Sequence, residues 1–349
     1  MVPGDPETVT GGYAYDRALV AALRRRGWSA RLIPLPADFP EPAHDSIDSA
    51  FDSIASVPAD GVVLVDGLAF GALPAERLQA LRRPVAVLVH HPLALEGGRS
   101  DTEAAAIAAT ELAALATAAA VIATSPATAR TLIADYGVPE HRLTVALPGT
   151  DRLPPAVGTG AVPTILTVAS ITRRKGHATL VAALDRIRDR AWRAVFVGDD
   201  RRDPACAAAL RHAIAERGLQ DRIRLTGAVT PLTLLDHYLG ADLFALVSTH
   251  EGYGMAFAEA LSAGLPIVAG DGGAVRDTVP ADAGLLVAPG DADATAAALA
   301  RLLGDPALRR RTAAAARRAG AALPTWDDTA AAVAAALTSD PANHLAKAS

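Results

Sequence analysis

A chain of 349 residues is too long for one ordinary hydrophobic core and suits two domains of about 150 to 200 residues each. The formal net charge of −5 argues against a nucleic-acid-binding protein, and a single cysteine, Cys206, excludes an internal disulfide framework and a multi-cysteine metal site. No apolar run is long enough for a membrane span and the N-terminus lacks a signal-peptide pattern, so we expect a cytoplasmic protein. An amphipathic helix face that binds a membrane surface is hard to recognise in a sequence, so peripheral contact with the inner face of a membrane stays open.

Short β-rich runs alternate with longer Ala-rich and Leu-rich helical patterns, which predicts βαβ units and mainly parallel sheets covered by helices. Only Met1 and Val2 precede the first Pro-Gly pair, so the first strand of the N-terminal half is expected to be a stub or missing, unless the true start lies upstream of Met1. In this half we expect strands at 30–35, 61–67, 84–90, 119–125 and 142–148, and helices at about 13–26, 103–117 and 126–136.

The second half repeats the same rhythm and predicts a doubly wound unit of its own. Its expected strands, each followed by a helical pattern, are 163–169, 193–199, 222–227, 241–248, 265–270 and 284–289. A stretch rich in Pro and Gly at 147–163 is interpreted as the linker. The expected domains are 1–152 and 153–323, followed by 324–349, a last helix that packs back towards the N-terminal domain and ends in a frayed tail.

Glu251 and Glu259 lie on either side of a Gly-Tyr-Gly turn in the stretch STHEGYGMAFAEALSAGLPIVAGDGGA. The glycines let the backbone approach a ligand, and the helix that begins behind them presents free N–H groups and a positive dipole end. A carboxylate at Glu259 can accept two hydrogen bonds from a ribose diol, while Glu251 faces the other end of the same ligand. Helical glutamates and turn glycines are also common without a ligand, so both interpretations stay open. The expected phosphate seat is Gly252, Tyr253, Gly254 and Met255.

A second cluster of candidates follows the first strand of the C-terminal half, in VASITRRKGH. Open α/β sheets deliver such loops to the ligand crevice at the carboxyl ends of their strands. Cations there, Arg173, Arg174 and Lys175, would stabilise the charge that develops on a pyrophosphate leaving group. A solvated basic loop is the alternative, and it suits Arg173 better than Lys175.

Two further candidates lie in the N-terminal half. His90 and His91 end a strand, where adjacent side chains point to opposite faces, and no third ligand at metal spacing appears nearby, so no metal site is expected. One of the two is expected to face the ligand and the other to pack or cap. Gly11 and Gly12 open the first helix and offer bare backbone N–H groups to a ligand.

With these motifs together the chain resembles glycosyltransferase family 4, the retaining enzymes with the GT-B fold. The resemblance extends over nearly the whole chain and rests on EGYGMAFAE, the following LSAGLPIVA, RRKGH, PGTD at the domain junction and TGGY near the start. It implies two Rossmann-like doubly wound parallel-sheet domains that face each other across a cleft. It also implies a hexose-type donor, a UDP-sugar or GDP-sugar, an unidentified hydroxyl acceptor, front-face attack without an enzyme nucleophile, and no cofactor or metal.

By the same resemblance Glu251 contacts donor-sugar hydroxyls, Glu259 contacts the ribose and Lys175 holds the pyrophosphate. The backbone of residues 252–255 contacts the sugar and phosphates, and the loops at Gly12 and Val229 contact the donor and its base. His90 or His91 lies near the anomeric carbon. The sequence departs from the family where Ser170 occupies the place of a phosphate-binding arginine, and Arg173 or Arg174 is the expected substitute.

Two other classes of protein stay open. A glycoside hydrolase, a phosphorylase or an epimerase on the same fold would use Glu251 and Glu259 on the sugar itself, but it would leave the Gly-Tyr-Gly turn and Lys175 without an anion. A non-catalytic nucleotide-sugar-binding protein would keep the donor pocket without turnover. Neither the acceptor nor the oligomeric state has a readable signal in the sequence.

Overall fold

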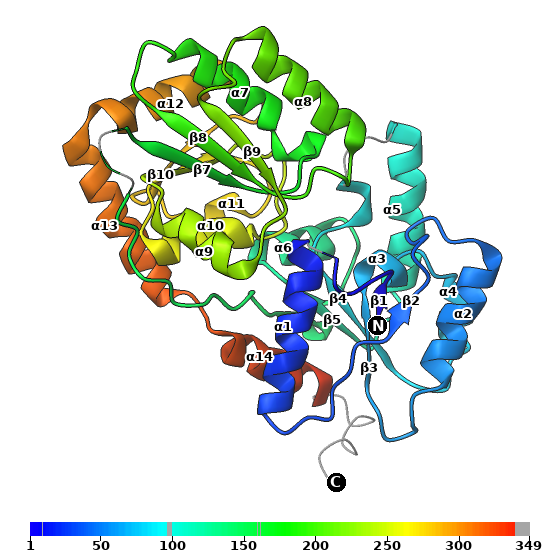
Figure 1. Ribbon diagram of the computed structural model, residues 1–349. Coiled ribbons are helices and arrows are strands. Elements are labelled where there is room, and N and C mark those ends of the chain that lie inside the picture. Colours follow the sequence, from blue (N-terminus) through cyan, green and yellow to red (C-terminus); the bar gives the residue numbers. More distant parts are fainter. Residues whose placement is uncertain (9, 96–99, 159, 161, 339–349) are drawn as a thin grey trace. The chain divides into compact units, whose positions relative to one another are not determined.

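The computed structural model describes residues 1–8, 10–95, 100–158, 160 and 162–338 (Figure 1). The described residues divide into two units, one formed by residues 1–149 with 324–338, and the other by residues 150–323. Both units carry parallel sheets with helices packed on them, which confirms the predicted α/β class. The expected frayed tail after residue 338 lies outside the described residues.

The first unit contains a parallel four-stranded sheet in the order β3-β4-β5-β6 and a two-stranded piece, β1-β2. Its strands are β1 (Val2–Pro3), β2 (Pro34–Leu35), β3 (Val63–Asp66), β4 (Val85–Val89), β5 (Ala120–Ala123) and β6 (Leu143–Val145). Its helices are α1 (Gly11–Arg25), α2 (His44–Ala55), α3 (Gly67–Phe70), α4 (Ala75–Gln79), α5 (Asp101–Leu115), α6 (Pro126–Ala134) and α14 (Trp326–Thr338), with 3-10 turns at Leu93–Leu95 and Glu140–Arg142.

The expected stub of a first strand is present, and the backbone of Met1 attaches it to the larger sheet. The Met1 amino group donates to the Leu64 carbonyl at 2.6 Å, and the Asp66 N–H donates to the Met1 carbonyl at 2.9 Å. The strand order across the unit is therefore β2-β1-β3-β4-β5-β6, in which β1 lies inside the array as in other doubly wound sheets.

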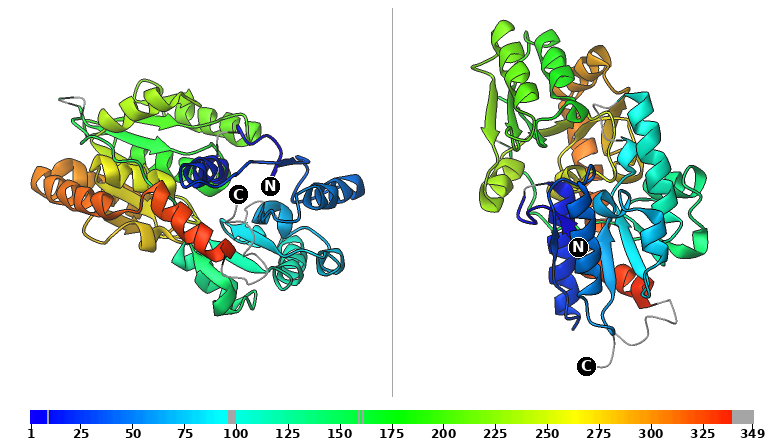
Figure 2. Two further views of the ribbon diagram at one scale, coloured as in Figure 1. Left: turned by 90° about the horizontal axis from the view of Figure 1, so that it is seen from below. Right: turned by 90° about the vertical axis from the view of Figure 1, so that its right-hand side faces the viewer.

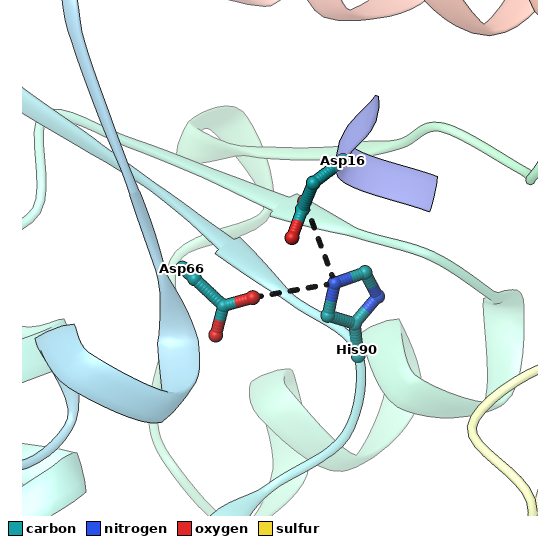
Figure 3. Close-up of side chains that lie close together, drawn as sticks. All are labelled: Asp16, Asp66 and His90. Carbon is teal, nitrogen blue, oxygen red and sulfur yellow. Dashed lines mark ion pairs between the residues drawn. The ribbon is translucent and has the colours of Figure 1, made fainter. Parts of the chain in front are cut away.

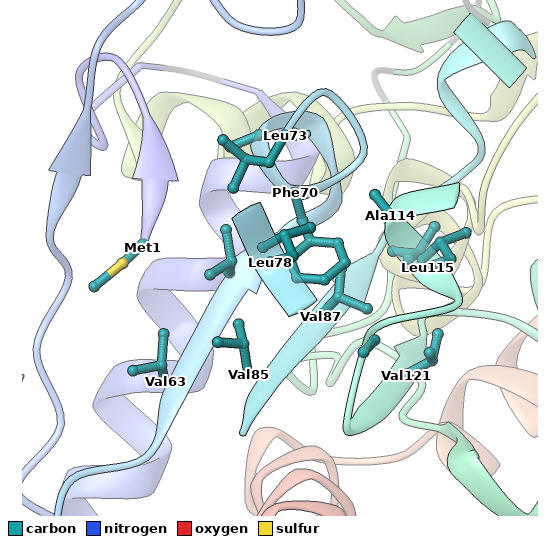
Figure 4. Close-up of a cluster of buried hydrophobic side chains, with 14 of the residues drawn as sticks. Met1, Val63, Phe70, Leu73, Leu78, Val85, Val87, Ala114, Leu115 and Val121 are labelled. Atoms are coloured by element: carbon teal, nitrogen blue, oxygen red, sulfur yellow. The ribbon is translucent and has the colours of Figure 1, made fainter. Parts of the chain in front are cut away.

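One face of this sheet forms an apolar core with α2 to α6, and the opposite face is covered by α1 and α14. On the second face the Tyr15 hydroxyl donates to the Ala146 carbonyl at 3.0 Å, and the Tyr15 ring meets the Trp326 ring edge-on. Figure 4 shows the first core, in which strand side chains pack against those of the covering helices and of the connection between α3 and α4: Val63, Val85, Val87, Val121, Phe70, Leu73, Leu78, Ala114 and Leu115.

Three helices of this unit were not predicted, and their sequences explain why. Half of the residues in the helix α2 (His44–Ala55) are Asp or Ser, and its buried side carries only Ala50, Phe51 and Ile54, a narrow stripe at helical spacing. The helices α3 and α4 are a single turn or little more. The start of α2 follows closely on β2, to which the expected strand at 30–35 is reduced.

The second unit has one parallel six-stranded sheet in the order β12-β11-β10-β7-β8-β9 (Figure 1). Its strands confirm all six predicted positions: β7 (Thr164–Val168), β8 (Arg193–Val197), β9 (Ile223–Gly227), β10 (Leu243–Leu246), β11 (Ile267–Gly270) and β12 (Gly284–Val287). Its helices are α7 (His177–Arg186), α8 (Pro204–Glu216), α9 (Pro231–Leu239), α10 (Met255–Ala263), α11 (Val275–Thr278), α12 (Ala292–Gly304) and α13 (Pro306–Ala322), preceded by a 3-10 turn at Arg173–Lys175.

Counted along the chain from β7, this strand order is the doubly wound order of dinucleotide-binding domains. The helices α7, α8 and α12 pack on one face of the sheet, and α9, α10, α11 and α13 pack on the other (Figure 2). The order reverses between β7 and β10, and ligands of such sheets bind beyond the carboxyl ends of the strands at that point. The loops that leave β7 and β10 carry Lys175 and Glu251.

A close backbone approach at Gly149 positions α14 in the first unit. A β-carbon at Gly149 would lie 2.3 Å from the Trp326 N atom, closer than non-bonded atoms can come. We expect Gly149→Ala to lower the free energy of unfolding by about 2 kcal/mol or more, seen as a lower Tm in calorimetry. The matched control is Gly11→Ala, because a β-carbon there meets nothing within 4 Å. An equal Tm for the two variants would contradict this role of Gly149.

Candidate active site

Lys175 and Glu251 form a buried ion pair at the switch point of the second unit. The Lys175 Nζ atom lies 2.7 and 2.9 Å from the two carboxylate oxygens of Glu251, although the residues are 76 positions apart in the sequence. The side chains are 17% and 6% exposed. The fold therefore brings together the expected pyrophosphate cation and the expected sugar carboxylate.

Arg174 adds a second cation to this pair. Its Nη1 atom lies 3.7 Å from Glu251 and donates to the His250 carbonyl at 2.7 Å. The Arg173 residue is exposed. Of the two arginines expected to substitute for the family's arginine, Arg174 is the one beside Lys175, so we assign the second phosphate cation to it as a prediction.

These cations set the charge of Glu251. Burial by itself raises the pKa of this carboxyl, but the charges of Lys175 and Arg174 and a hydrogen bond from Lys175 outweigh it and hold the pKa below its usual value. Glu251 is therefore a carboxylate at neutral pH. A phosphate that binds Lys175 must compete with it.

The start of α10 has the geometry expected of an anion seat. Gly254 precedes the helix with φ +88°, a left-handed conformation that favours glycine, and the first helical hydrogen bond is donated by Phe257 to the Gly254 carbonyl. The amides before Phe257 therefore lack an intrahelical acceptor. Tyr253 is buried, and Thr278 donates to its carbonyl at 2.6 Å, which fixes the turn. The remaining expected seat residues, Gly252 and Met255, are half-buried.

Glu259 lies in the second turn of α10 and has a partner that was not predicted. The Tyr238 hydroxyl donates to Glu259 Oε2 at 2.6 Å. Burial raises the pKa of Glu259, the Tyr238 hydrogen bond lowers it, and the Asp151 charge raises it, with a net increase. Val229, the expected base contact, lies half-buried in the loop between β9 and α9, against the apolar core under α9 and α10.

In the first unit His90 lies between two carboxylates from other elements (Figure 3). Its Nε2 atom is 3.4 Å from Asp66, at the end of β3, and 3.7 Å from Asp16, on α1. Both acids are buried. Gly12 lies on the same side, because a β-carbon there would be 3.4 Å from the His90 Cδ2 atom. Gly12 and His90, which are far apart in the sequence, are thus neighbours in the fold.

The trio carries a proton on its imidazole. Burial lowers the pKa of His90, but the charges of the nearby Asp16 and Asp66 carboxylates outweigh it and raise the pKa to about 10. Burial and the Asp66 charge raise the pKa of Asp16. At neutral pH His90 is therefore an imidazolium between the two acids.

The sequence shows no third ligand at metal spacing near His90 and His91, but the fold brings two carboxylates from other elements to His90. Among the described residues, Asp16, Asp66 and His90 are the one group of three such side chains whose ligand atoms all lie within 4.8 Å of one another. A protonated imidazole donates both of its N–H groups and has no lone pair for a metal. The expected absence of a metal stays a prediction. His91 is half-buried beside His90 and does not belong to the trio.

Sequence reasoning missed Asp16, Asp66 and Tyr238. Asp66 had a usable signal, because it lies near the end of the predicted strand 61–67 and His90 lies at the end of the next predicted strand, 84–90. Parallel strands bring their carboxyl ends to one edge. Asp16 is a polar residue on the buried side of α1, and Tyr238 an aromatic residue on the buried side of α9. Neither pattern predicts which acid or base it meets.

Two family models match the chain: Glycosyltransferase Family 4 over residues 62–152 and Glycosyl transferases group 1 over residues 158–319. Together they cover the strands β3 to β12 and include His90, Lys175, Glu251 and Glu259. The chain therefore belongs to the family 4 type of glycosyltransferases.

Among curated relatives, a GDP-mannose-dependent alpha-(1-6)-phosphatidylinositol monomannoside mannosyltransferase of Mycobacterium tuberculosis is 35% identical over 42% of this chain and 40% of its own length. A D-inositol 3-phosphate glycosyltransferase of Kineococcus radiotolerans is 32% identical over 54% of this chain and 50% of its own length. The chain thus spans half or less of the length of these relatives.

Solved structures share the fold. A sucrose-phosphate synthase from Thermosynechococcus elongatus has a TM-score of 0.80 at 23% identity, with 95% of this chain and 96% of that chain covered. The Anabaena protein HepE in complex with UDP-glucose has a TM-score of 0.78 at 18% identity, with 97% and 99% covered. Among the described residues, no helix has both the length and the apolar character needed to cross a membrane.

Proposed function

We propose that the protein is a retaining hexosyltransferase that uses a UDP-sugar or GDP-sugar as donor and a hydroxyl group as acceptor. The observation that carries the proposal is the Lys175–Glu251 pair beside the start of α10, at the switch point of a dinucleotide-type sheet. A cation, a helix N-terminus and a carboxylate are the partners that a diphosphate and a sugar need at adjoining positions. Glu259 supplies the contact to the ribose.

In the proposed reaction the acceptor oxygen attacks the anomeric carbon from the side on which the diphosphate leaves. The bond from carbon to the acceptor oxygen forms, the bond to the phosphate oxygen breaks, and the leaving diphosphate takes the acceptor proton. Lys175, Arg174 and the α10 amides stabilise the charge on the departing diphosphate. Glu251 orients the sugar hydroxyls, and His90, an N–H donor, binds a hydroxyl or phosphate oxygen of the donor.

The names of the relatives indicate which donors and acceptors to test first. A GDP-mannose-dependent relative and a structural neighbour bound to UDP-glucose support testing GDP-mannose and UDP-glucose first as donors. The names of two curated relatives contain inositol or phosphatidylinositol, so inositol derivatives are the first acceptors to test. Because the proposed reaction uses no metal, we expect turnover to persist in EDTA.

The first test of the proposal measures nucleotide binding by thermal shift, with UDP, GDP, ADP and dTDP as ligands. A nucleotide at about 100 times its dissociation constant adds about 2.7 kcal/mol to the free energy of unfolding, which raises Tm measurably. We expect UDP or GDP to stabilise the wild type and the Arg173→Ala control, and to have little effect on Lys175→Ala. If none of the four stabilises the folded wild type, the donor site is misassigned.

A further inference from the structure

Tyr238 is placed to act on the nucleotide through Glu259. Its hydroxyl lies 2.6 Å from Glu259 Oε2, and the residue is 1% exposed. Glu259 is half-buried, so Tyr238 holds one carboxylate oxygen from the buried side. A carboxylate has about four lone-pair positions, and one donated hydrogen bond leaves positions for the two hydroxyls of a vicinal diol.

Tyr238 is itself fixed by packing. Its ring stacks on that of Phe244, with ring centroids 6.1 Å apart and an interplanar angle of 19°. The hydroxyl also lies 3.3 Å from the Ala256 carbonyl, in the first turn of α10. The phenol group therefore ties α9 to α10 and sets the direction in which the Glu259 carboxylate faces.

We propose that Tyr238 is a positioning residue that orients the Glu259 carboxylate for the ribose diol, so that the site prefers ribonucleotides to deoxyribonucleotides. The inference rests on the proposed function, because it needs a nucleotide donor. It assigns no contact between Tyr238 and the nucleotide. The phenol group acts only through the carboxylate.

The charged and hydrogen-bonding groups around Glu259 predict how nucleotide affinity depends on pH. The groups that face this carboxyl are Tyr238 from α9 and Asp151 from the segment before β7. Donation from Tyr238 favours the charged form of Glu259, while the Asp151 charge disfavours it. Removal of the phenol hydroxyl therefore raises the pKa of Glu259 further. Nucleotide affinity then declines on acidification at a higher pH than in the wild type.

The test is isothermal titration calorimetry of the whole protein with UDP and GDP and with their 2′-deoxy and 3′-deoxy forms. We expect Tyr238→Phe to bind the preferred ribonucleotide about tenfold more weakly, with deoxynucleotide affinity changed less than about twofold. Glu259→Gln is expected to lose the preference for ribonucleotides. Tyr136→Phe is the matched control, because Tyr136 also donates to a buried carboxyl, Glu111, in the first unit. It should leave nucleotide binding unchanged.

Three other outcomes would overturn the inference, and they separate it from the proposed function. Unchanged discrimination in Tyr238→Phe would show that Tyr238 does not position Glu259, and so would an equal loss for ribonucleotides and deoxynucleotides together with a lower Tm. A folded wild type that binds no nucleotide would remove the proposed function and the inference with it. The pH at which half of the nucleotide affinity is lost is expected to be higher in Tyr238→Phe than in the wild type, and an unchanged pH would also contradict the inference.

Discussion

Replacement of Glu251 by Gln is expected to reduce kcat for sugar transfer by at least about 100-fold, the scale seen when one preorganised polar group is removed from an active site. The carboxylate is buried, and both of its oxygens contact Lys175. In the proposed reaction it also orients the donor sugar. Gln keeps the shape but lacks the charge, so the sugar is oriented less well while the Lys175 ammonium is released towards the diphosphate. We therefore expect UDP or GDP affinity to be retained or increased.

Steady-state kinetics together with calorimetry measures both effects. Glu216→Gln is a matched control, because Glu216 is an exposed glutamate on α8 that pairs with His212. An unchanged kcat in Glu251→Gln would contradict the assignment of Glu251, and so would a loss of nucleotide affinity as large as that of kcat. Tm is measured in parallel, since removal of one partner of a buried ion pair can cost about 3 to 5 kcal/mol.

The pH dependence of this pair has a definite sign. The pKa of Glu251 is lower in the folded protein than in the unfolded chain. Its contribution to the free energy of unfolding is therefore present above the ordinary carboxyl pKa and is lost as the pH falls through the lowered value. Glu251→Gln should flatten this acid side of the stability profile.

The second large effect is expected at His90. In the wild type His90 stays protonated through neutral pH, because Asp16 and Asp66 raise its pKa to about 10. We expect Asp66→Asn to return the pKa of His90 towards its usual value of about 6.5. The drop is observable as a titration of the imidazole by NMR, with His90→Gln to assign the signal. In a transfer assay kcat/KM of the variant should fall between about pH 6 and 8, a range in which the wild type is level.

The free energy of unfolding also depends on the protonation of His90. A group whose pKa is higher in the folded protein contributes stability that is complete below its unfolded pKa, about 6.5 for a histidine, and that is lost as the pH rises through about 10. Asn at position 66 can still accept the Leu68 N–H that Asp66 now accepts at 2.7 Å, so the start of α3 is retained. Either a wild-type imidazole that titrates near pH 6.5 or a stoichiometric divalent metal on the purified protein would contradict an imidazolium in this trio.

Much of the protein follows from local sequence. The order of strands and helices in the second unit could be predicted, because β-rich runs alternate with helical periods over the whole region and turn residues mark most boundaries. The residues from Glu251 to Glu259 were also recognisable, since a turn and the helix behind it are contiguous in the chain. Short or polar helices such as α2 were missed for the opposite reason, because their apolar stripe is too narrow to stand out.

The tertiary structure decided the partners of the site residues. Lys175 meets Glu251 because β7 and β10 are adjacent in the sheet, and Asp66 meets His90 because β3 and β4 are adjacent; neither pairing can be read from propensity. Asp16 and Tyr238 reach their acid or base partners only through helix packing. Sequence specifies which residues can carry charge or bind phosphate. The strand order and the packing of helices on the sheets determine which charges meet, since such contacts join segments far apart in the chain.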